Sequence, residues 1–283
     1  MNIIYCYDPI NYKKVDSCFE EEELIAKEFG FNIYYINYED LVNYNNVLKA
    51  TKTINNKINL IDNITIYRGW MLSPEKYTIL YNKLLDKKIK LINNPEQYKF
   101  CHYSPNNYST ILDHTPKSIY IPKEEINIDN IKNRLSVFNS SPIILKDYVK
   151  SQKHYWNKAC YIDDSSNIKN IMKIVNNFLE LNDNLIEGGL TFKQFEDFIK
   201  VENKVKEYRI FILNKKIINT EINLEIKEFC NNELKDIINN IQSNFFSIDL
   251  AKRKSDNVWR IIEIGDGQVS SISNDINILK KVL

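Results

Sequence analysis

The sequence is short of the residues that build disulfide frameworks, structural zinc sites and glycine-rich nucleotide loops. Its 283 residues include five cysteines, three histidines and six glycines. The cysteine count is odd and no C-x-x-C pair occurs, so neither a disulfide framework nor a zinc site is expected. We expect reduced thiols and a cytoplasmic protein. The absence of G-x-G-x-x-G and G-x-x-x-x-G-K-[ST] argues against a Rossmann dinucleotide fold and a P-loop.

The sequence also lacks a dominant charge and a long apolar run. Its formal net charge is +1, which argues against a general field that recruits nucleic acid or anionic membrane, although a local basic groove stays open. No apolar stretch approaches the ~20 residues that span a bilayer. Neither G-x-S-x-G nor H-E-x-x-H is present, so a nucleophile elbow and a zincin helix are not indicated.

The first third of the chain alternates strands and helices. Strands are expected at residues 3–7, 31–37, 64–67 and 89–92, and the helices between them are expected from residue 20 to Gly30, at 39–50 and from Ser73-Pro74 to about 88. Proline at the first helical position and glycine at the end are typical helix signals. The βαβα rhythm predicts a small parallel sheet covered by helices on both faces, in a domain of residues 1–94.

The remainder, residues 95–283, is expected to be α+β with antiparallel pairs. A strand is predicted at 142–150, helices at about 125–138, 166–181 and 226–242, and hairpins at 206–213/216–222 and 245–253/258–264. The fold class is therefore α/β plus α+β.

The last hairpin carries one acid on each strand. A three-residue loop pairs Lys254 with Val258 and places Asp249 directly opposite Glu263. Carboxylates at opposed positions repel at a Cβ separation of about 4.5–5.5 Å. One interpretation is that the true loop has two or four residues, which turns one acid to water. The other is that Mg²⁺ bridges them, since Mg²⁺ prefers carboxylate and phosphate oxygens.

Two further strands carry cations on one face. The stretch PIILKDYVK places Lys146 and Lys150 on the face opposite its apolar residues, and EYRIFIL does the same with Glu207 and Arg209. Arginine offers a planar fork for phosphate oxygens. Solvated lysines and a surface ion pair of Glu207 are the alternative interpretations.

In chain order these positions resemble an ATP-grasp enzyme: a strand lysine, a strand that reaches a hinge at Leu190 to Phe195, a strand arginine, a metal aspartate and a metal glutamate. The stretches PIILKDYVKSQKHYW, EGGLTFKQF, EYRIFI and IIEIGDGQVS resemble the ATP-grasp clade named for one arginine and two lysines. YRGWMLSPEKY and INNPEQYKFCHY also resemble that clade, so the resemblance covers about residues 64–272.

The resemblance implies an ATP-grasp fold, in which a small parallel α/β domain precedes two α+β subdomains that clamp ATP. The lysine-bearing subdomain would cover about residues 119–192 and the metal-binding subdomain about 193–283. By similarity, Lys146 would contact the α- and β-phosphates, Arg209 the γ-phosphate or an acyl phosphate, and Asp249 and Glu263 would hold Mg²⁺.

The same resemblance assigns the remaining nucleotide contacts. The backbone at Gln194 and Phe195 would hydrogen-bond adenine, and Lys153 is a further candidate for ATP binding.

One position departs from the superfamily pattern. Gly265 stands where an asparagine usually follows the metal glutamate by two residues. Asp266 or Gln268 is a candidate for the missing ligand.

Arg68 follows a predicted strand of the parallel sheet, where open α/β sheets bind ligands. It is a candidate for gripping an acidic substrate, with Lys150 or Lys153 assisting. The alternative is a structural ion pair.

The implied function is an ATP- and Mg-dependent, ADP-forming ligase that activates a carboxylate as an acyl phosphate for attack by an amine. The expected partners are ATP and small-molecule or peptide substrates, with nucleic acid open but not favoured and no membrane. Two alternatives remain: an ATP-grasp enzyme with another acceptor, kinase-like or acting on RNA ends, and a non-catalytic nucleotide-binding protein.

Overall fold

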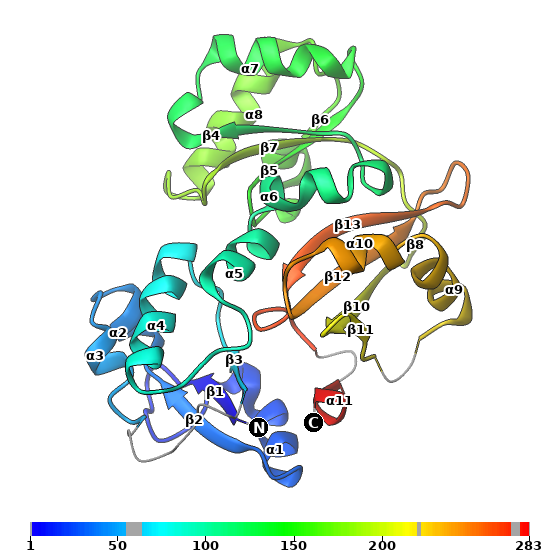
Figure 1. Ribbon diagram of the computed structural model, residues 1–283. Helices are drawn as coiled ribbons and strands as arrows, with labels where there is room; N and C mark the ends of the chain where they lie inside the picture. Colours follow the sequence, from blue (N-terminus) through cyan, green and yellow to red (C-terminus); the bar gives the residue numbers. More distant parts are fainter. Residues whose placement is uncertain (1, 55–63, 220–221, 273–277, 283) are drawn as a thin grey trace. The chain divides into compact units, whose positions relative to one another are not determined.

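A computed structural model describes residues 2–54, 64–219, 222–272 and 278–282 (Figure 1). The chain divides into two compact units. Unit 1 comprises Met1–Cys101, Arg209–Ile248 and Gly265–Leu283, and unit 2 comprises His102–Tyr208 and Asp249–Ile264. Each unit combines segments that are far apart in the sequence. The domain and subdomain boundaries expected at residues 94 and 192 stay predictions.

A three-stranded parallel sheet opens unit 1. Its strands are β1 (Asn2–Cys6), β2 (Asn32–Ile36) and β3 (Thr65–Arg68), in the order β2-β1-β3. One face packs with residues of helices α2 (Tyr38–Val42), α3 (Val47–Ala50) and α4 (Pro74–Asp86). The other face packs with α1 (Glu20–Glu28) and with Phe211 and Phe245. Apolar groups on both faces explain why these strands have nearly continuous apolar sequences.

The ends of these helices agree with the sequence signals in two places. The hydroxyl of Ser73 accepts a hydrogen bond from the Lys76 N–H at 3.3 Å, and Pro74 begins α4. Gly30 follows α1 with a φ of +75°, which glycine adopts without steric cost. The single helix expected at 39–50 is instead two helices, because Asn46 caps a new start at α3. The strand expected at 89–92 is only a bridge between Leu91 and Thr65.

A second sheet has the strand order β11-β10-β12-β13. Its strands are β10 (Glu207–Leu213), β11 (Lys216–Ile217), β12 (Phe245–Lys252) and β13 (Trp259–Asp266). The helices that follow β11 and β13 are α9 (Leu224–Asn232), α10 (Lys235–Asn240) and α11 (Ile278–Val282). The β10–β11 hairpin confirms the expected pairing, although β11 is shorter than the strand expected at 216–222, and α9 and α10 replace the single helix expected at 226–242.

Unit 2 is built on an antiparallel sheet of order β4-β7-β5-β6. Its strands are β4 (Ser118–Pro122), β5 (Ile143–Asp147), β6 (Tyr161–Ile162) and β7 (Gly189–Gln194). Helices α7 (Ile128–Leu135) and α8 (Ile168–Leu181), drawn in Figure 1, supply most of the remaining apolar core, and Phe138, Ala159 and Ile186 complete it. Helices α5 (Pro95–His102) and α6 (Ser104–Asn107) precede the sheet, and a small hairpin of β8 (Lys200–Val201) and β9 (Lys204–Val205) follows it.

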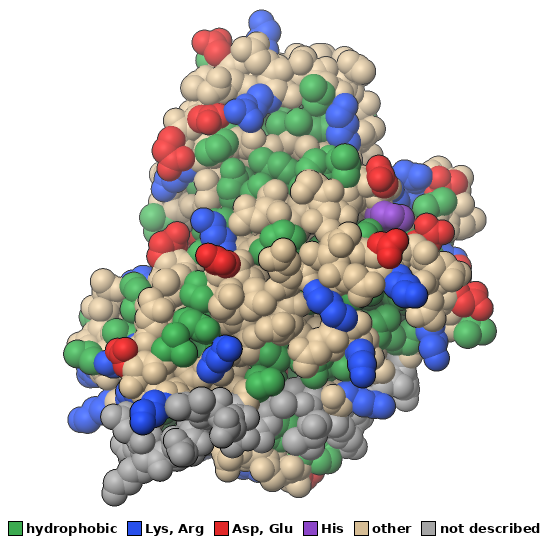
Figure 2. Space-filling model, viewed as in Figure 1, with side chains coloured by type: hydrophobic (Ala, Val, Ile, Leu, Met, Phe, Trp, Pro, Cys, Tyr) green, Lys and Arg blue, Asp and Glu red, His purple; other side chains and the backbone are tan. Residues whose placement is uncertain are grey.

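Single helical turns complete the described chain. They are Ser17–Phe19, Tyr108–Thr110, Leu112–His114, Lys123–Glu125, Ser136–Phe138, Lys153–Tyr155 and the π-turn Trp156–Cys160. All five cysteines are free thiols. Among the described residues, no helix has the length and apolar character that a membrane crossing requires. Basic and acidic side chains are interspersed over the face drawn in Figure 2, in keeping with the balanced charge.

Candidate active site

The candidate site in unit 2 begins with two neighbouring strands whose side chains alternate. Lys146 of β5 lies opposite Thr191 of β7 in the strand register, and Lys193 is two residues further along β7. Leu145 and Phe192 point to the opposite face and are 0% exposed in the core. The burial of this apolar pair fixes the register, so Lys146, Thr191 and Lys193 share the other face.

Glu263 of β13 meets this face. The Lys146 Nζ lies 3.2 Å from the Glu263 Oε2, with the lysine side chain 14% exposed and the glutamate side chain 43% exposed. The Lys193 ammonium donates a 2.7 Å hydrogen bond to the carbonyl oxygen of Ile262. These side chains line a pocket of about 340 Å³, its open mouth included. The buried Thr191 Oγ1 also lines it and has no hydrogen-bond partner among the described residues.

Two titratable groups here have pKa values shifted by burial. Burial, with the neighbouring charge of Lys146, lowers the pKa of Lys193 to about 7. Burial, with the charges of Lys150 and Lys146, lowers the pKa of His102 to about 4, so this imidazole is neutral near pH 7. The site therefore contains a lysine, Lys193, whose charge responds to its surroundings near pH 7.

Asp249 and Glu263 lie on adjacent strands in the predicted register. The Gly267 N–H donates to the Phe245 carbonyl at 3.1 Å, and a Cβ on Gly265 would lie 3.0 Å from the Ser247 Oγ. Continuing this pairing by two residues puts Asp249 opposite Glu263.

The expected loop of the last hairpin is wrong by one residue. The Arg253 N–H donates to the Val258 carbonyl, and Asn257 adopts a φ of +58°. The pairing therefore shifts by one between loop and site, as in a β-bulge. The buried residues of β13 agree with this shift. They alternate as Trp259 and Ile261 near the loop and as Ile264 and Asp266 nearer the site, so the alternation changes phase by one residue between the two pairs.

Asp266, expected as a metal ligand, is held in a hydrogen-bond network of unit 1, and its role as a ligand stays a prediction. Within the described part of the chain, no three His, Cys, Asp or Glu side chains gather as a metal site. Asp266 is 1% exposed and accepts hydrogen bonds from the Asn93 side chain at 2.6 Å and from the Gln268 N–H at 3.0 Å. Burial raises its pKa to about 7.

Gly265 and Gln268 also have structural explanations. A Cβ on Gly265 would come within 2.9 Å of the Ser270 Oγ, and the Ser247 and Ser270 hydroxyls are themselves hydrogen-bonded at 2.8 Å. An asparagine therefore does not fit at Gly265 without rearrangement. The Gln268 side chain accepts from the Tyr67 N–H and donates to the Tyr77 hydroxyl, so it supports unit 1 rather than a metal.

Arg68 has structural contacts within unit 1 that argue against its expected role in gripping an acidic substrate, and that role stays a prediction. Its side chain is 3% exposed and forms a two-pronged ion pair with Glu22, at 2.6 and 2.9 Å. Its Nη1 donates to the carbonyl oxygens of Gly267, Gln268 and Ser270. A guanidinium with this set of buried acceptors has little left to offer a substrate.

The other expected cations lie at different places. The expected strand 142–150 ends at Asp147, so Lys150 lies in the turn that follows and does not share the strand face of Lys146. Lys153 is exposed and lies 3.7 Å from Glu207, the surface ion pair that the sequence left open. Arg209 belongs to unit 1 and donates to the Ser271 carbonyl at 3.3 Å.

The backbone N–H groups at the expected adenine hinge are already used within unit 2. Gln194 donates to the Lys117 carbonyl at 2.7 Å, and Phe195 donates to the Pro142 carbonyl at 2.9 Å. The N–H groups of Gln194 and Phe195 are therefore engaged, and adenine binding by the hinge backbone stays a prediction that its carbonyl oxygens or neighbouring residues would have to meet.

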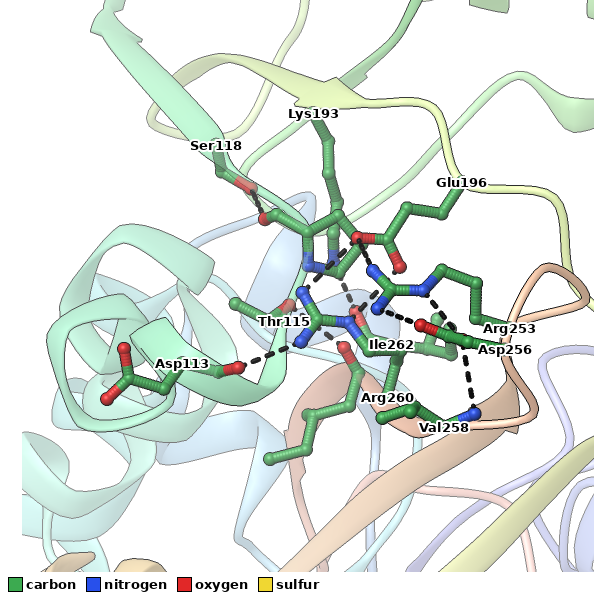
Figure 3. A network of polar contacts seen from close by, with 12 residues as sticks. Asp113, Thr115, Ser118, Lys193, Glu196, Arg253, Asp256, Val258, Arg260 and Ile262 are labelled. Carbon is green, nitrogen blue, oxygen red and sulfur yellow. Dashed lines mark hydrogen bonds and ion pairs between the residues drawn. The ribbon is translucent and has the colours of Figure 1, made fainter.

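The sequence interpretation missed a polar network beside the site (Figure 3). Glu196, just after β7, accepts from Arg260 at 3.1 and 3.2 Å and forms an ion pair with Arg253 at 3.2 Å. Arg253 also pairs with Asp256 at 2.7 Å. The network ties the end of β7 to the β12–β13 hairpin, whose Ile262 carbonyl receives the Lys193 ammonium.

The lysine of this network could have been found in the sequence. In GLTFKQF, Leu190 and Phe192 alternate with Thr191 and Lys193, which is the pattern of a half-buried strand. Glu196 and Arg260 gave no such signal, because charged residues near strand ends are common on surfaces.

The ATP-grasp fold and the family are confirmed by comparison with known proteins. Residues 134–283, more than half of the chain, match an ATP-grasp domain that is family 3 of the clade named for one arginine and two lysines. The chain therefore belongs to the ATP-grasp superfamily and, within it, to family 3 of that clade. No curated protein sequence matches the chain.

Solved structures share the fold at low sequence identity. The D-cycloserine synthetase DcsG has a TM-score of 0.65 at 8% identity, with 100% of this chain and 98% of that chain covered. The D-alanine–D-alanine ligase from Bacillus anthracis, complexed with ATP, has a TM-score of 0.57 at 14% identity, with 99% and 93% covered. The ATP-grasp ligase PsnB, complexed with Mg and ADP, has a TM-score of 0.52 at 9% identity, with 96% and 90% covered.

Proposed function

We propose that this protein is an ATP- and Mg-dependent ligase that joins a carboxylate to an amine and releases ADP. The observation that carries the proposal is the meeting of Lys146, Lys193 and Glu263 at one pocket, in a chain of the ATP-grasp family. Phosphoryl transfer needs positioning and charge compensation more than a nucleophilic side chain. Two ammonium groups and an acid at one pocket are suited to that task.

The carboxylates fit a magnesium ion by their chemistry and their place in the register. Asp249 and Glu263 offer hard oxygen ligands from adjacent strands, and Mg²⁺ is commonly bound by one or two carboxylates together with substrate phosphates. Asp249 and Glu263 would hold the ion, and Asp266 is not needed. When bound, the ion neutralises phosphate charge.

The chain's own residues would act on the nucleotide and its acceptor as follows. Lys146, and Lys193 once protonated, bind phosphate oxygens, and Thr191 supplies a hydroxyl from the same face. Arg209 remains our proposal for the γ-phosphate. Lys150 and Lys153 remain proposals for the acid substrate and the nucleotide, respectively.

The proposed reaction has two steps. A carboxylate oxygen of the substrate takes the terminal phosphoryl group, and the bond to ADP breaks. The amine then attacks the carbonyl carbon, phosphate leaves with the bonding electrons, and a proton leaves the nitrogen as the C–N bond forms. Water must be excluded between the two steps, since an acyl phosphate is hydrolysable.

The proposed setting is the cytoplasm, supported by the five free thiols. The proposed partners are ATP and a small-molecule or peptide acid and amine. DcsG, the D-alanine–D-alanine ligase and PsnB are ligases or synthetases by name, which supports this class of substrates.

Hydroxylamine trapping tests the function without knowledge of the amine. The protein is incubated with ATP, Mg²⁺, hydroxylamine and pools of carboxylic acids, and hydroxamate and ADP are measured. We expect both to appear together with the correct acid. AMP instead of ADP refutes this form of the proposal, and a phosphorylated product that resists hydroxylamine identifies a kinase-like enzyme.

A matched pair of variants links the activity to the site. Asp249→Asn should lower Mg-dependent ADP release by about 10²-fold or more, since it removes a charge that would hold the metal. Asp129→Asn, an exposed aspartate of α7, serves as the control and should keep full activity. Equal activity of both variants would show that Asp249 does not take part.

A further inference from the structure

The β8–β9 hairpin and the end of β12 form a three-stranded ribbon in unit 2. The Ile199 N–H donates to the Lys252 carbonyl at 2.9 Å, and the Lys254 N–H donates to the Asp197 carbonyl at 2.8 Å. The segment that contains Ile199 also pairs on its other side with β9, where Val201 lies opposite Lys204. The ribbon therefore consists of residues 252–254, 197–201 and 204–206 side by side, all antiparallel.

Strand alternation sorts the side chains of this ribbon into two faces. Residues paired across strands share a face, and residues one apart along a strand do not. Ile199 lies between Lys252 and Lys206, since the Lys206 N–H donates to the Ile199 carbonyl at 2.9 Å. The residues of this face, called the lysine face here, are Asp197, Ile199, Val201, Lys204, Lys206, Lys252 and Lys254.

An aromatic pair underlies two of these lysines. The Lys206 Nζ lies 5.4 Å from the Tyr208 ring centre, and the Lys252 Nζ lies 5.1 Å from that of Trp259. The two rings contact each other edge to face at 5.6 Å. Such cation–π contacts favour defined positions of the ammonium groups. The lysine face is therefore ordered in part by the fold.

The lysine face concentrates positive charge in a protein whose net charge is only +1. Lys204, Lys206 and Lys254 are exposed, and the Lys254 side chain is 70% accessible. Residues two apart on a strand lie about 7 Å apart, and the outer strands lie about 10 Å apart, so four ammonium groups cover a small area. Asp197 is the one acid among the seven residues of this face, and it pairs with Lys254 at 3.5 Å.

We propose that the lysine face binds the phosphate backbone of a single-stranded nucleic acid. Its cations are all lysines, which bind phosphate oxygens as point charges and do not require the fixed planar geometry of a bidentate arginine contact. Arg253 lies on the other face and is already paired with Glu196 and Asp256. Val201, 53% exposed among the lysines, offers apolar contact to an unpaired base.

This surface is separate from the proposed ligase site. Lys252 and Asp249 are three residues apart on β12, so they point to opposite sides of the strand. The inference therefore goes beyond the proposed function and does not depend on it.

Fluorescence anisotropy with a labelled oligouridylate of about 15 nucleotides tests the proposal. Four phosphate contacts predict a slope of log K against log salt of about −2.8, which is a loss of about fiftyfold in affinity between 50 and 200 mM salt. Changing Lys204, Lys206, Lys252 and Lys254 together to glutamine should lower the affinity at least about tenfold and bring the slope close to zero.

The control variant removes the same charge elsewhere in unit 2. It changes four other exposed lysines to glutamine: Lys123, Lys132, Lys169 and Lys173. It should bind like the wild type. Equal loss in both variants would mean that only net charge matters, which overturns the proposal.

Two further outcomes also refute it. Tight binding of polyglutamate with no binding of the oligonucleotide would identify an acidic protein as the partner. If nothing binds, and the lysine-face variant only aggregates, the lysines serve to protect a sheet edge.

Discussion

Replacement of Arg68 by methionine tests the assignment of this residue to the fold. In the wild type the side chain is 3% exposed, pairs with Glu22 and donates to three backbone carbonyl oxygens. The variant leaves the buried Glu22 carboxylate without its cation. Breaking one side of a buried ion pair typically costs about 3–5 kcal/mol. Because proteins are stable by only about 5–15 kcal/mol, the loss should be a large fraction of the total.

The assay is urea unfolding followed by circular dichroism, with intrinsic fluorescence as a second probe of whether the two units unfold together. Arg134→Met is the control, because Arg134 also pairs with a glutamate, Glu125 at 2.5 Å, but here both side chains are exposed, by 45% and 44%. An exposed pair contributes at most about 1 kcal/mol. The double variant Arg68→Met with Glu22→Gln should recover part of the loss, since the unpaired charge is then removed.

One result would refute this reasoning. If Arg68→Met unfolds at the wild-type urea concentration and only raises the KM for an acid substrate, Arg68 binds substrate after all. Arg68→Lys separates charge from geometry, because an ammonium keeps the charge but cannot reach Glu22 and three carbonyls at once. It should lose most of the stability that the methionine variant loses.

Three more predictions concern the pocket and the backbone. Lys193→Met should weaken ATP binding about tenfold. In the wild type, calorimetry should show that ATP affinity falls as pH rises through about 7, where Lys193 loses its proton, and the variant should lack this fall. A variant with the pH profile of the wild type would contradict the assignment. Gly188→Ala should lower the free energy of unfolding by more than Gly30→Ala. Both glycines have positive φ, +70° at Gly188 and +75° at Gly30, but only at Gly188 would an added Cβ meet another group, the Tyr148 ring at 2.2 Å. Equal melting temperatures of the two variants would therefore argue against tight packing of Gly188 on Tyr148. Asp266 has a pKa raised from 3.8 to about 7, so its folded state holds a proton that the unfolded state releases, and stability should fall as pH rises from about 4 to about 7. Asp266→Asn should remove a few kcal/mol of this pH dependence in urea titrations, and an unchanged difference between pH 5 and pH 8 would refute the buried carboxyl's role.

The parallel sheet and the two main hairpins could be predicted because their signals are local. Apolar runs of strand length, the Ser73-Pro74 helix start and the helix end at Gly30 depend on neighbouring residues alone. Helix breaks were missed where the interruption is subtle. Asn46 divides the expected helix at 39–50 by capping a second start, which a pattern of apolar residues does not reveal.

The site was predictable only in part, because it depends on how strands pair. Lys146 and Glu263 were expected from their strands and from the family resemblance, and the structure brings them to 3.2 Å. Lys193 was missed, although alternation in GLTFKQF sets it apart from Leu190 and Phe192, because that pattern does not show that β7 pairs with β5 and so places it on the face of Lys146. Lys150 was misplaced because β5 ends three residues before it, where Asp147 accepts hydrogen bonds from the following turn.

The sequence by itself determined the family, the order of the strands that carry charge and the alternation that sets lysines apart from apolar residues. Those properties follow from side-chain chemistry and a period of two along each strand. Tertiary structure decided which charged groups are available to a ligand. Arg68 and Asp266 look like site residues in the chain, yet both are buried and hydrogen-bonded in unit 1, because long-range partners such as Glu22 and Asn93 satisfy them. Partners that lie dozens of residues or more away in the sequence are chosen by packing, which no local pattern records.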